Sequence, residues 1–320
     1  MRIYLWDNIK VVLMLFVILT HSICVYQQND TMWVQYYWVL IMTYTMPLFT
    51  ITSGFWFKKK NIRNVCMRFL WPFIVFSIII FAWGGVFYEP YKNATIGTYL
   101  RLAYAMWYLW ALFIYYLITP VLLKHFRTTT IFYTSLLIAL SIGFLPFIGT
   151  LLQLSRVICF YPFFILGILL KERNEWLHKL KNRSKVCMLV LIMLSIFYMY
   201  INFLHPGIVY GTGFMSGFGF SIKGLMVRIF TYFMCIAMSI SFIGFMPNKK
   251  IWFTKFGTRT MNAYLCHMLI IFPCTWGIGP HIIDKWYGIC FLIVIVPLLC
   301  IPLYSNILNR IMNKILLIKK

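Results

Sequence analysis

The feature that most constrains the fold is a series of apolar segments, each about 20 residues long, separated by short basic segments. A helix of that length crosses the hydrocarbon core of a bilayer. Hydrophobic residues make up 62% of the 320 positions and charged residues 11%, whereas about a quarter of a soluble domain is charged. The sequence therefore predicts an all-α fold, a polytopic transmembrane helical bundle that forms a single domain over residues 1–320.

Ten segments are apolar and long enough to be predicted as spans. They are residues 10–27, 33–57, 69–88, 102–123, 129–147, 152–170, 186–203, 225–246, 260–277 and 287–308. The first follows a basic start, but no small-residue cleavage site comes after it. We therefore interpret it as a retained helix rather than a signal peptide.

Lysine and arginine gather between alternate spans, with 23 of the 29 on one side. The positive-inside rule places that side in the cytoplasm, and it accounts for the net charge of +23 without a nucleic-acid partner. Both termini would then be cytoplasmic, in agreement with an even number of spans. The residues are Arg2, Lys10, Lys58, Lys59, Lys60, Arg63, Arg68, Lys124, Arg127, Lys171, Arg173, Lys179, Lys181, Arg183, Lys185, Lys249, Lys250, Lys255, Arg259, Arg310, Lys314, Lys319 and Lys320.

The segments on the opposite side are poor in positive charge. The longest, residues 204–224, is rich in glycine and is interpreted either as a mobile outer cap or as a slack connector. Asp30, Glu89 and Asp284 are the only acids on this side, and any of them could orient an imidazole.

Three ionisable residues near the start of the chain share one helical face. His21 comes 11 residues after Lys10, which is about 16 Å and three turns of helix. Asp7 precedes Lys10 by three residues and can pair with it at the cytoplasmic mouth. This pattern predicts a path for an anionic ligand with acid–base chemistry at its far end. The alternative is a buried histidine bonded to a neighbouring helix.

Further polar residues fall inside the later spans, where ionisable groups commonly mark functional sites. Tyr264 and His267 are one turn apart and can line one face of the ninth span. Arg156 and Arg228 are intramembrane cations that could meet a phosphate, a carboxylate or a pore. Alternatively, the side chain of Arg228 could extend to the membrane–water interface.

The fourth span opens with an aromatic cluster that includes Trp107, which is typical either of a membrane-interface belt or of a binding site. Nine scattered cysteines show no metal-ligand spacing, so we expect no metal site. The signatures of common soluble enzymes, such as GxSxG, the P-loop and HExxH, do not occur in the sequence.

Six short motifs, in order from about residue 4 to residue 270, resemble those of the acyltransferase-3 family of membrane acyltransferases. The resemblance is strongest to the branch described as fucose 4-O-acetylase-like. Lysine stands where the family's basic-x10-His motif more often has arginine. The motifs are Lys10 with His21 after Trp6-Asp7-Asn8-Ile9, Met46-Pro47-Leu48-Phe49 with Ser53-Gly54, Arg68 with Pro72, Trp107-Tyr108-Leu109-Trp110-Ala111-Leu112, Tyr161-Pro162-Phe163-Phe164-Ile165-Leu166-Gly167, and Gly257-Thr258-Arg259-Thr260 with Tyr264 and His267.

The resemblance implies ten helices around a site that acetyl-CoA reaches from the cytoplasm, in the inner membrane of a bacterium. It implies acetyl transfer to a sugar hydroxyl of a surface glycan or of its lipid-linked precursor. The family's essential histidine corresponds to His21, its paired basic residue to Lys10, and its arginine near the cofactor to Arg68. Its acidic residue late in the chain has no match, because the only acid beyond residue 180 is Asp284.

The resulting hypothesis gives each candidate a role. Lys10, Arg68 and either Arg63 or Lys58 hold the phosphates of acetyl-CoA. His21 acts as a general base on the sugar hydroxyl or accepts the acetyl group transiently. His267 is the second catalytic candidate and, with Tyr264, helps to position the acceptor. The other candidates for positioning the substrate are Asp7, Trp107 and Arg156.

The depth of His21 favours an acceptor on the outer side, and the alternative is chemistry on the cytoplasmic face. Two other function classes remain open from the sequence. A transporter or flippase of a lipid-linked sugar would show broken helices in paired halves, and we find no such internal symmetry. A non-catalytic membrane scaffold would not explain why Asp7, Lys10 and His21 share one helical face.

Overall fold

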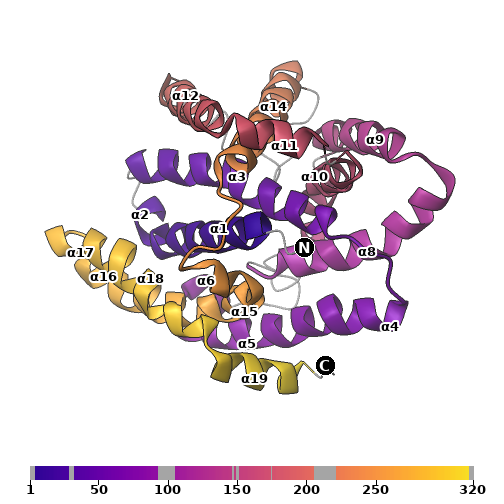
Figure 1. Ribbon diagram of the computed structural model, residues 1–320. Coiled ribbons are helices and arrows are strands. Elements are labelled where there is room, and N and C mark those ends of the chain that lie inside the picture. The colour runs from indigo at the N-terminus through magenta and orange to yellow at the C-terminus, as the bar shows by residue number, and fades with distance from the viewer. Residues whose placement is uncertain are drawn as a thin grey trace. The chain divides into compact units, whose positions relative to one another are not determined.

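The computed structural model describes residues 4–28, 32–92, 105–145, 148, 151–173, 175–204 and 221–316, and every regular element in these ranges is helical (Figure 1). Arg2, Asp30, Lys319, Lys320 and most of the glycine-rich segment 204–224 lie outside the described residues. The chain forms two compact units. The first comprises residues 1–38, 63–110 and 248–320, and the second comprises residues 39–62 and 111–247.

The first unit carries the start and the end of the chain. Its helices are α1 (Tyr4–Ser22), α2 (Cys24–Gln28), η1 (Cys66–Leu70), α5 (Trp71–Phe87), α6 (Glu89–Lys92), η5 (Thr254–Thr258), α15 (Thr260–Ile271), η6 (Phe272–Ile278), α16 (Gly279–Ile282), α17 (Trp286–Cys290), η7 (Phe291–Ile295), α18 (Val296–Leu299), η8 (Ile301–Tyr304) and α19 (Asn306–Ile315). Three helices cross a boundary between the units: α3 (Met32–Phe55), α4 (Ile62–Val65) and α8 (Trp107–His125).

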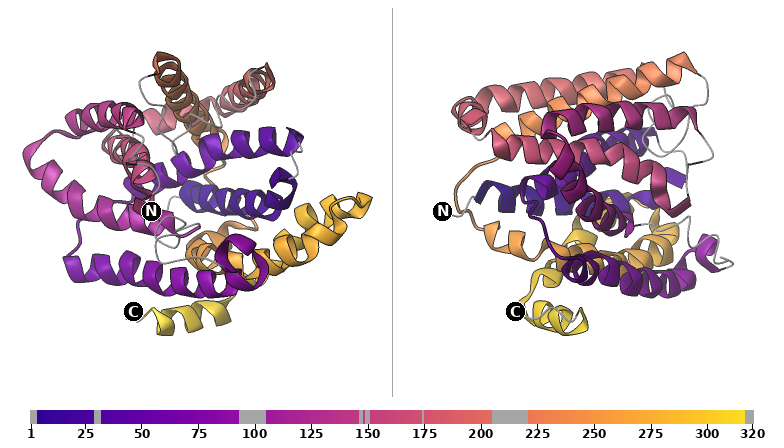
Figure 2. Two further views of the ribbon diagram at one scale, coloured as in Figure 1. Left: turned by 180° about the vertical axis from the view of Figure 1, so that it is seen from behind. Right: turned by 90° about the vertical axis from the view of Figure 1, so that its right-hand side faces the viewer.

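The second unit contains the middle of the chain. Its helices are α9 (Thr128–Ser141), η2 (Ile142–Phe144), η4 (Leu151–Gln153), α10 (Leu154–Glu172), α11 (Glu175–Asn182), α12 (Ser184–Leu204) and α14 (Ile222–Phe245). Within it, α9 lies beside α10 and α12 lies beside α14 (Figure 2).

Eight helical stretches of the described chain are long and apolar enough to cross a membrane. They are Tyr4–Ser22, Ile62–Phe87, Trp107–His125, Leu154–Glu172, Ser184–Ile201, Ile222–Phe245, Thr260–Ile282 and Trp286–Tyr304. The predicted spans 33–57 and 129–147 correspond to α3 and to the shorter apolar stretch Thr128–Phe144. An all-α, multi-pass membrane protein is thus confirmed, while the count of ten and the cytoplasmic placement of both termini stay predictions.

Two predicted spans have other bounds than the helices that correspond to them. The first helix already begins at Tyr4 and ends at Ser22, so Asp7 and Lys10 lie within it rather than at its edge. The last span was expected to run to residue 308, but its helical stretch ends at Tyr304. The hydroxyl of Ser305 accepts a hydrogen bond of 3.1 Å from the Leu308 amide and so caps a separate helix, α19.

In the second unit, two of the quoted motifs meet at a close helix crossing. A Cβ atom added at Gly54 on α3 would lie 1.9 Å from the carbonyl oxygen of Phe164 on α10. A Cβ atom added at Gly167 would lie 2.1 Å from the carbonyl oxygen of Ile51. Small residues at such crossings let the backbones of membrane helices approach closely. The two motifs therefore have a packing role.

In the first unit, three helical segments have the wider π-helical turn. They are η1, η6 and η7, and each is flanked by an α-helix that continues the same stretch. π-helical turns are rare and occur frequently at functional sites. Among the described residues all π-helical turns are in this unit, which also contains both candidate histidines.

Candidate functional site

Helix α1 carries the ion pair that the spacing predicted. Nζ of Lys10 lies 2.9 Å from Oδ1 of Asp7, one turn earlier on the same helix. Both side chains are largely withdrawn from solvent, with 27% of Lys10 and 12% of Asp7 exposed. The pair therefore sits at the margin of the helix packing, where a ligand phosphate could still reach the ammonium group.

The start of α1 is held by a polar network from residues 248–254, in which the bond between Thr254 and Asn8 is buried. The hydroxyl of Thr254 donates to Oδ1 of Asn8 at 2.7 Å, and Nδ2 of Asn8 donates to the carbonyl of Lys249 at 3.1 Å. The amide of Leu5 donates to Oδ1 of Asn248 at 3.0 Å. These bonds fix the first turns of α1, and with them Lys10, against the segment that leads into α15.

Gly257 brings the same segment against Asp7. A Cβ atom at this glycine would lie 2.6 Å from both the Cβ and the carbonyl oxygen of Asp7. Only a residue without a side chain allows this approach. The glycine of the sixth motif thus places the backbone of η5 directly beside the Asp7–Lys10 pair.

The far end of α1 is held by a second buried bond. The hydroxyl of Thr275 in η6 donates to the carbonyl of Ser22 at 3.1 Å. Thr275 and Ser22 are both fully buried. Because α1 also packs along α15 between the two attachments, Lys10 and His21 are fixed relative to His267.

His21 and His267 lie side by side in the first unit. The centroids of their rings are 5.5 Å apart and the ring planes are inclined by 44°. His21 comes from the last turn of α1 and His267 from the second half of α15. The two histidines that the sequence singled out separately are therefore neighbours in the fold.

His267 is fully buried and its orientation is fixed by its own helix. Nδ1 lies 2.7 Å from the carbonyl oxygen of Tyr264. Because a carbonyl only accepts hydrogen bonds, Nδ1 must carry the proton of a neutral ring, and Nε2 then presents a lone pair. Nε2 is buried without a hydrogen-bond partner among the described residues.

Tyr264 and the aromatic cluster of α8 extend the site. The ring of Tyr264 lies 6.0 Å from that of His267 and 6.0 Å from that of Tyr108, and its hydroxyl donates to the carbonyl of Ala105. Trp107 and Tyr108 are both buried. Their burial favours the binding-site interpretation of this cluster over an outward-facing belt.

The predicted arginines are distributed over both units. Arg63 on α4 and Arg68 on η1 belong to the first unit, and both side chains are exposed and thus accessible to an anionic ligand. Arg156 on α10 belongs to the second unit. Eight of the nine predicted site residues therefore fall in the first unit, and Arg156 is the exception.

The interpretation that Arg228 extends to the interface is wrong. Its side chain is fully buried in the second unit, and Nη1 donates to the carbonyl of Ala139 at 3.4 Å. A guanidinium has five N–H donors and is not deprotonated in proteins. Arg228 is therefore held inside the helix packing as a buried donor.

The candidate acidic partners of the histidines do not favour such a role. Glu89 is exposed and pairs with Lys92 on α6, and Asp284 is also exposed, whereas His267 is fully buried. Asp30 lies outside the described residues. Within the described part of the chain, no group of three or more His, Cys, Asp or Glu could hold a metal ion.

The sequence interpretation missed Thr254 and Thr275, and it quoted Asn8 only as part of a motif. All three are buried polar residues that attach α1 to the segment around α15. The sequence could have indicated them, because a polar side chain in an apolar span costs free energy and is therefore kept for a functional or structural reason.

Comparison with known proteins identifies the domain. The family model described as "Acyltransferase domain" (Acyl_transf_3) matches residues 3–305. The nodulation protein NolL of Mesorhizobium japonicum is 26% identical over 217 residues, which cover 62% of this chain and 55% of that protein. NolL of Sinorhizobium fredii is 26% identical over 192 residues, which cover 53% of this chain and 49% of that protein.

The chain thus spans about half the length of these curated relatives. No solved structure matches it. The family match includes both histidines, the Asp7–Lys10 pair and both attachments of α1. The chain carries an acyltransferase domain over residues 3–305 and belongs to the acyltransferase-3 family.

Proposed function

We propose that this chain is a membrane-embedded O-acetyltransferase of the bacterial inner membrane. It moves an acetyl group from cytoplasmic acetyl-CoA to a sugar hydroxyl of a surface polysaccharide or of its lipid-linked precursor. One observation carries the proposal. Within an acyltransferase domain, Lys10 and His21 lie on one helix attached at both ends, and a second imidazole, His267, lies beside His21.

The donor would bind along α1. Phosphate groups form strong charge-assisted hydrogen bonds with ammonium and guanidinium groups, so Lys10, Arg63 and Arg68 are the proposed phosphate ligands. His21 lies about 16 Å further along the same helix. An extended arm of the donor can follow the helix over that distance, with the thioester at the histidine and the phosphates at the cytoplasmic mouth.

The reaction needs one proton acceptor and no redox step. His21 takes the proton of the acceptor hydroxyl while the hydroxyl oxygen forms a bond to the carbonyl carbon of the acetyl group. The carbon–sulfur bond then breaks, and His21 returns the proton to the departing thiolate, which leaves as free CoA. In an alternative sequence of steps, His21 itself receives the acetyl group and passes it to the hydroxyl.

The acceptor is proposed from the motif pattern, which resembles the fucose 4-O-acetylase-like branch. The two relatives are named as nodulation proteins, and these names specify neither donor nor acceptor. The ring of Tyr264 lies beside His267, the buried ring of Tyr108 lies beside Tyr264, and Trp107 is next to Tyr108. These rings offer flat faces and hydroxyl groups suited to a sugar ring.

The test is acetyl transfer in isolated membranes. Membranes that contain the protein are incubated with acetyl-CoA labelled in the acetyl group, and labelled glycan is quantified. We expect wild-type membranes to label the glycan and His21→Ala membranes to label it at least about 100-fold more slowly. The matched control is His281→Ala, since His281 is exposed on α16. Labelling that persists unchanged in His21→Ala would overturn the role of His21.

A further inference from the structure

The buried nitrogen of His267 points to a role that the proposed function alone does not assign. The bond from Nδ1 to the Tyr264 carbonyl commits the ring to one tautomer, with the proton on Nδ1 and a lone pair on Nε2. Nε2 is fully buried and has no partner among the described residues. Leaving a buried polar atom unpaired costs free energy, and such groups call for a specific explanation.

The explanation must involve a hydrogen-bond donor, because the lone pair of Nε2 can only accept a hydrogen bond. His21 is the neighbouring imidazole, with a ring centroid 5.5 Å from that of His267. At this separation a hydrogen bond between ring nitrogens can form directly or through one water. A neutral imidazole has one N–H donor, and an imidazolium has two.

We propose that His267 is a positioning residue that acts through His21. Its Nε2 lone pair accepts a hydrogen bond from one ring nitrogen of His21, so that the other nitrogen of His21 faces the acceptor hydroxyl as the base. The inference rests on the proposed acetyl transfer. In that reaction His267 takes the orienting position that a carboxylate occupies in a Ser-His-Asp arrangement.

The role follows the proton through the reaction. His21 becomes an imidazolium when the nitrogen that faces the acceptor removes the hydroxyl proton, and its other N–H continues to donate to the lone pair of His267. This hydrogen bond stabilises the charge while the proton stays on His21. The proton passes to the thiolate as the carbon–sulfur bond breaks, so His267 ends each turnover as it began, neutral and protonated on Nδ1.

The helix geometry provides what such a role requires. The attachment between Thr275 and Ser22 fixes the backbone next to His21, and the Tyr264 carbonyl fixes the ring of His267. Neither Glu89 nor Asp284 offers a buried carboxylate for the orienting position, because both are exposed. The second imidazole lies beside His21 and is placed to do so.

Two substitutions separate the nitrogens of His267. Asparagine places its amide near the position of Nδ1, so His267→Asn retains a donor to the Tyr264 carbonyl and removes the acceptor at Nε2. Glutamine reaches the position of Nε2, so His267→Gln retains an acceptor there. Matched controls are His281→Asn and His281→Gln on exposed α16.

We expect His267→Asn to lower kcat for acetyl transfer by about 100-fold, with the KM for acetyl-CoA changed by less than about threefold. We expect His267→Gln to retain kcat within about tenfold of the wild type. A purely structural role predicts the opposite order or equal losses. Equal losses in the two variants, or full activity in His267→Asn, would overturn the proposal.

A measurement on the folded wild-type protein needs no turnover. In protein labelled with ¹⁵N at histidine, the resonances of His267 are assigned by their loss in His267→Gln. Nδ1 should appear protonated and Nε2 unprotonated, and His21→Ala should shift the Nε2 resonance. An Nε2-protonated ring, or an Nε2 resonance indifferent to His21→Ala, would overturn the inference. If wild-type membranes transfer no acetyl group, the proposed function fails separately from this result.

Discussion

Thr254 and Asn8 are 246 positions apart in the chain, and the hydroxyl of Thr254 donates a 2.7 Å hydrogen bond to Oδ1 of Asn8. Thr254 is 2% exposed and Asn8 is fully buried. The bond connects the first turns of α1 with the segment that leads into α15. It therefore helps to hold the Asp7–Lys10 pair in place beside η5.

The first prediction concerns the strength of this connection. Thr254→Val keeps the shape of the side chain but removes the donor to Asn8, so we expect the free energy of unfolding to fall by about 1–3 kcal/mol. The measurement is thermal or denaturant unfolding of the purified protein in detergent. Thr258→Val is the matched control, because Thr258 is exposed on the same segment, and it should change stability by less than about 0.5 kcal/mol.

A double-mutant cycle isolates the pair. If the bond couples the two residues, the losses caused by Asn8→Ala and Thr254→Val will not add up in the double variant. We expect a deviation from additivity of about 0.5–3 kcal/mol. Strictly additive losses would show that the two side chains contribute independently.

The second prediction concerns the binding of acetyl-CoA at Lys10. Lys10→Gln removes a cation proposed to hold a phosphate, so we expect the KM for acetyl-CoA to rise by more than kcat falls. Lys10→Arg retains the charge and should keep KM within a few-fold of the wild type. Steady-state transfer rates at varied acetyl-CoA concentrations measure both constants. A fall confined to kcat would argue against the phosphate-holding role.

Much of this arrangement could be predicted from local sequence periodicity. The apolar segments indicated the spans, and the 3- and 11-residue spacings placed Asp7, Lys10 and His21 on one face of a helix. The ion pair at 2.9 Å confirms the local part of that prediction. Helical periodicity is short-range information, and it suffices where the partners lie on the same helix.

Contacts between distant segments could not be predicted in this way. The sequence marked His21 and His267 as separate candidates, but periodicity contains no information about which spans pack together. The attachments at Thr254 and Thr275 depend on that packing. The π-helical turns are likewise a property of the folded backbone.

The third prediction concerns the close crossing of α3 and α10. Gly167→Ala would place a Cβ atom 2.1 Å from the Ile51 carbonyl oxygen and 2.7 Å from the Phe55 amide nitrogen. Backbone atoms cannot rotate away as a flexible side chain can, so the helices must separate. We expect the free energy of unfolding to fall by about 1–3 kcal/mol in detergent, and Gly54→Ala should behave in the same way.

Gly85→Ala is the matched control for these substitutions. Gly85 lies within α5, and the nearest atom to an added Cβ is the Tyr91 carbonyl oxygen at an ordinary 3.7 Å. Alanine is favoured over glycine in a helix interior by up to about 1 kcal/mol, so we expect this variant to be neutral or more stable. A stability loss at Gly85 equal to that at Gly167 would contradict the crossing argument.

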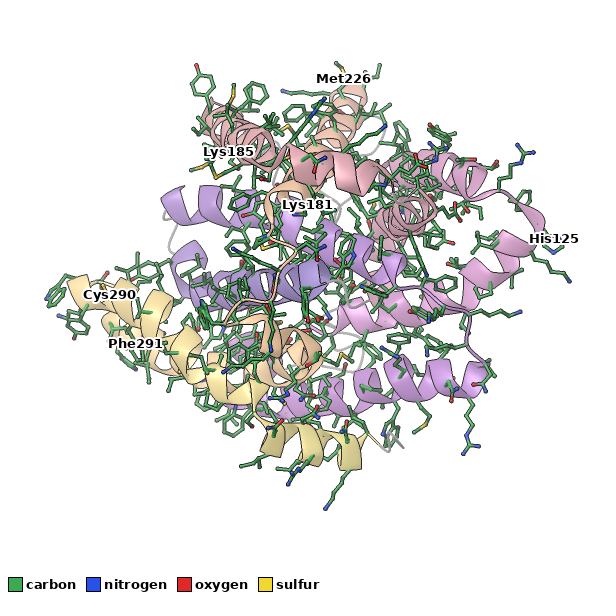
Figure 3. The ribbon with its side chains drawn as sticks, in the orientation of Figure 1. His125, Lys181, Lys185, Met226, Cys290 and Phe291 are labelled. Carbon is green, nitrogen blue, oxygen red and sulfur yellow. The ribbon has the colours of Figure 1, made fainter. Side chains whose placement is uncertain are left out.

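The fourth prediction concerns Lys181 on α11, which is labelled in Figure 3. Its ammonium group donates to the carbonyl of Gly244 at 3.1 Å and to that of Met246, at the end of α14. Burial disfavours the charged form and lowers the pKa of Lys181 from 10.5 to about 8, against a smaller opposing effect of Cys187.

This lowered pKa gives stability a defined pH dependence. Between about pH 8 and pH 10.5 the unfolded chain holds more protons at Lys181 than the folded chain does, so stability contributed by this residue rises with pH across that window. Below about pH 8 both states are protonated and the cost of burying the charge is fully present. We expect the Tm of the purified protein to reflect this rise. Lys181→Met should remove the Lys181 contribution to the slope, whereas Lys179→Met, at an exposed position on the same helix, should retain it. An unchanged slope in Lys181→Met would show that another group causes the pH dependence.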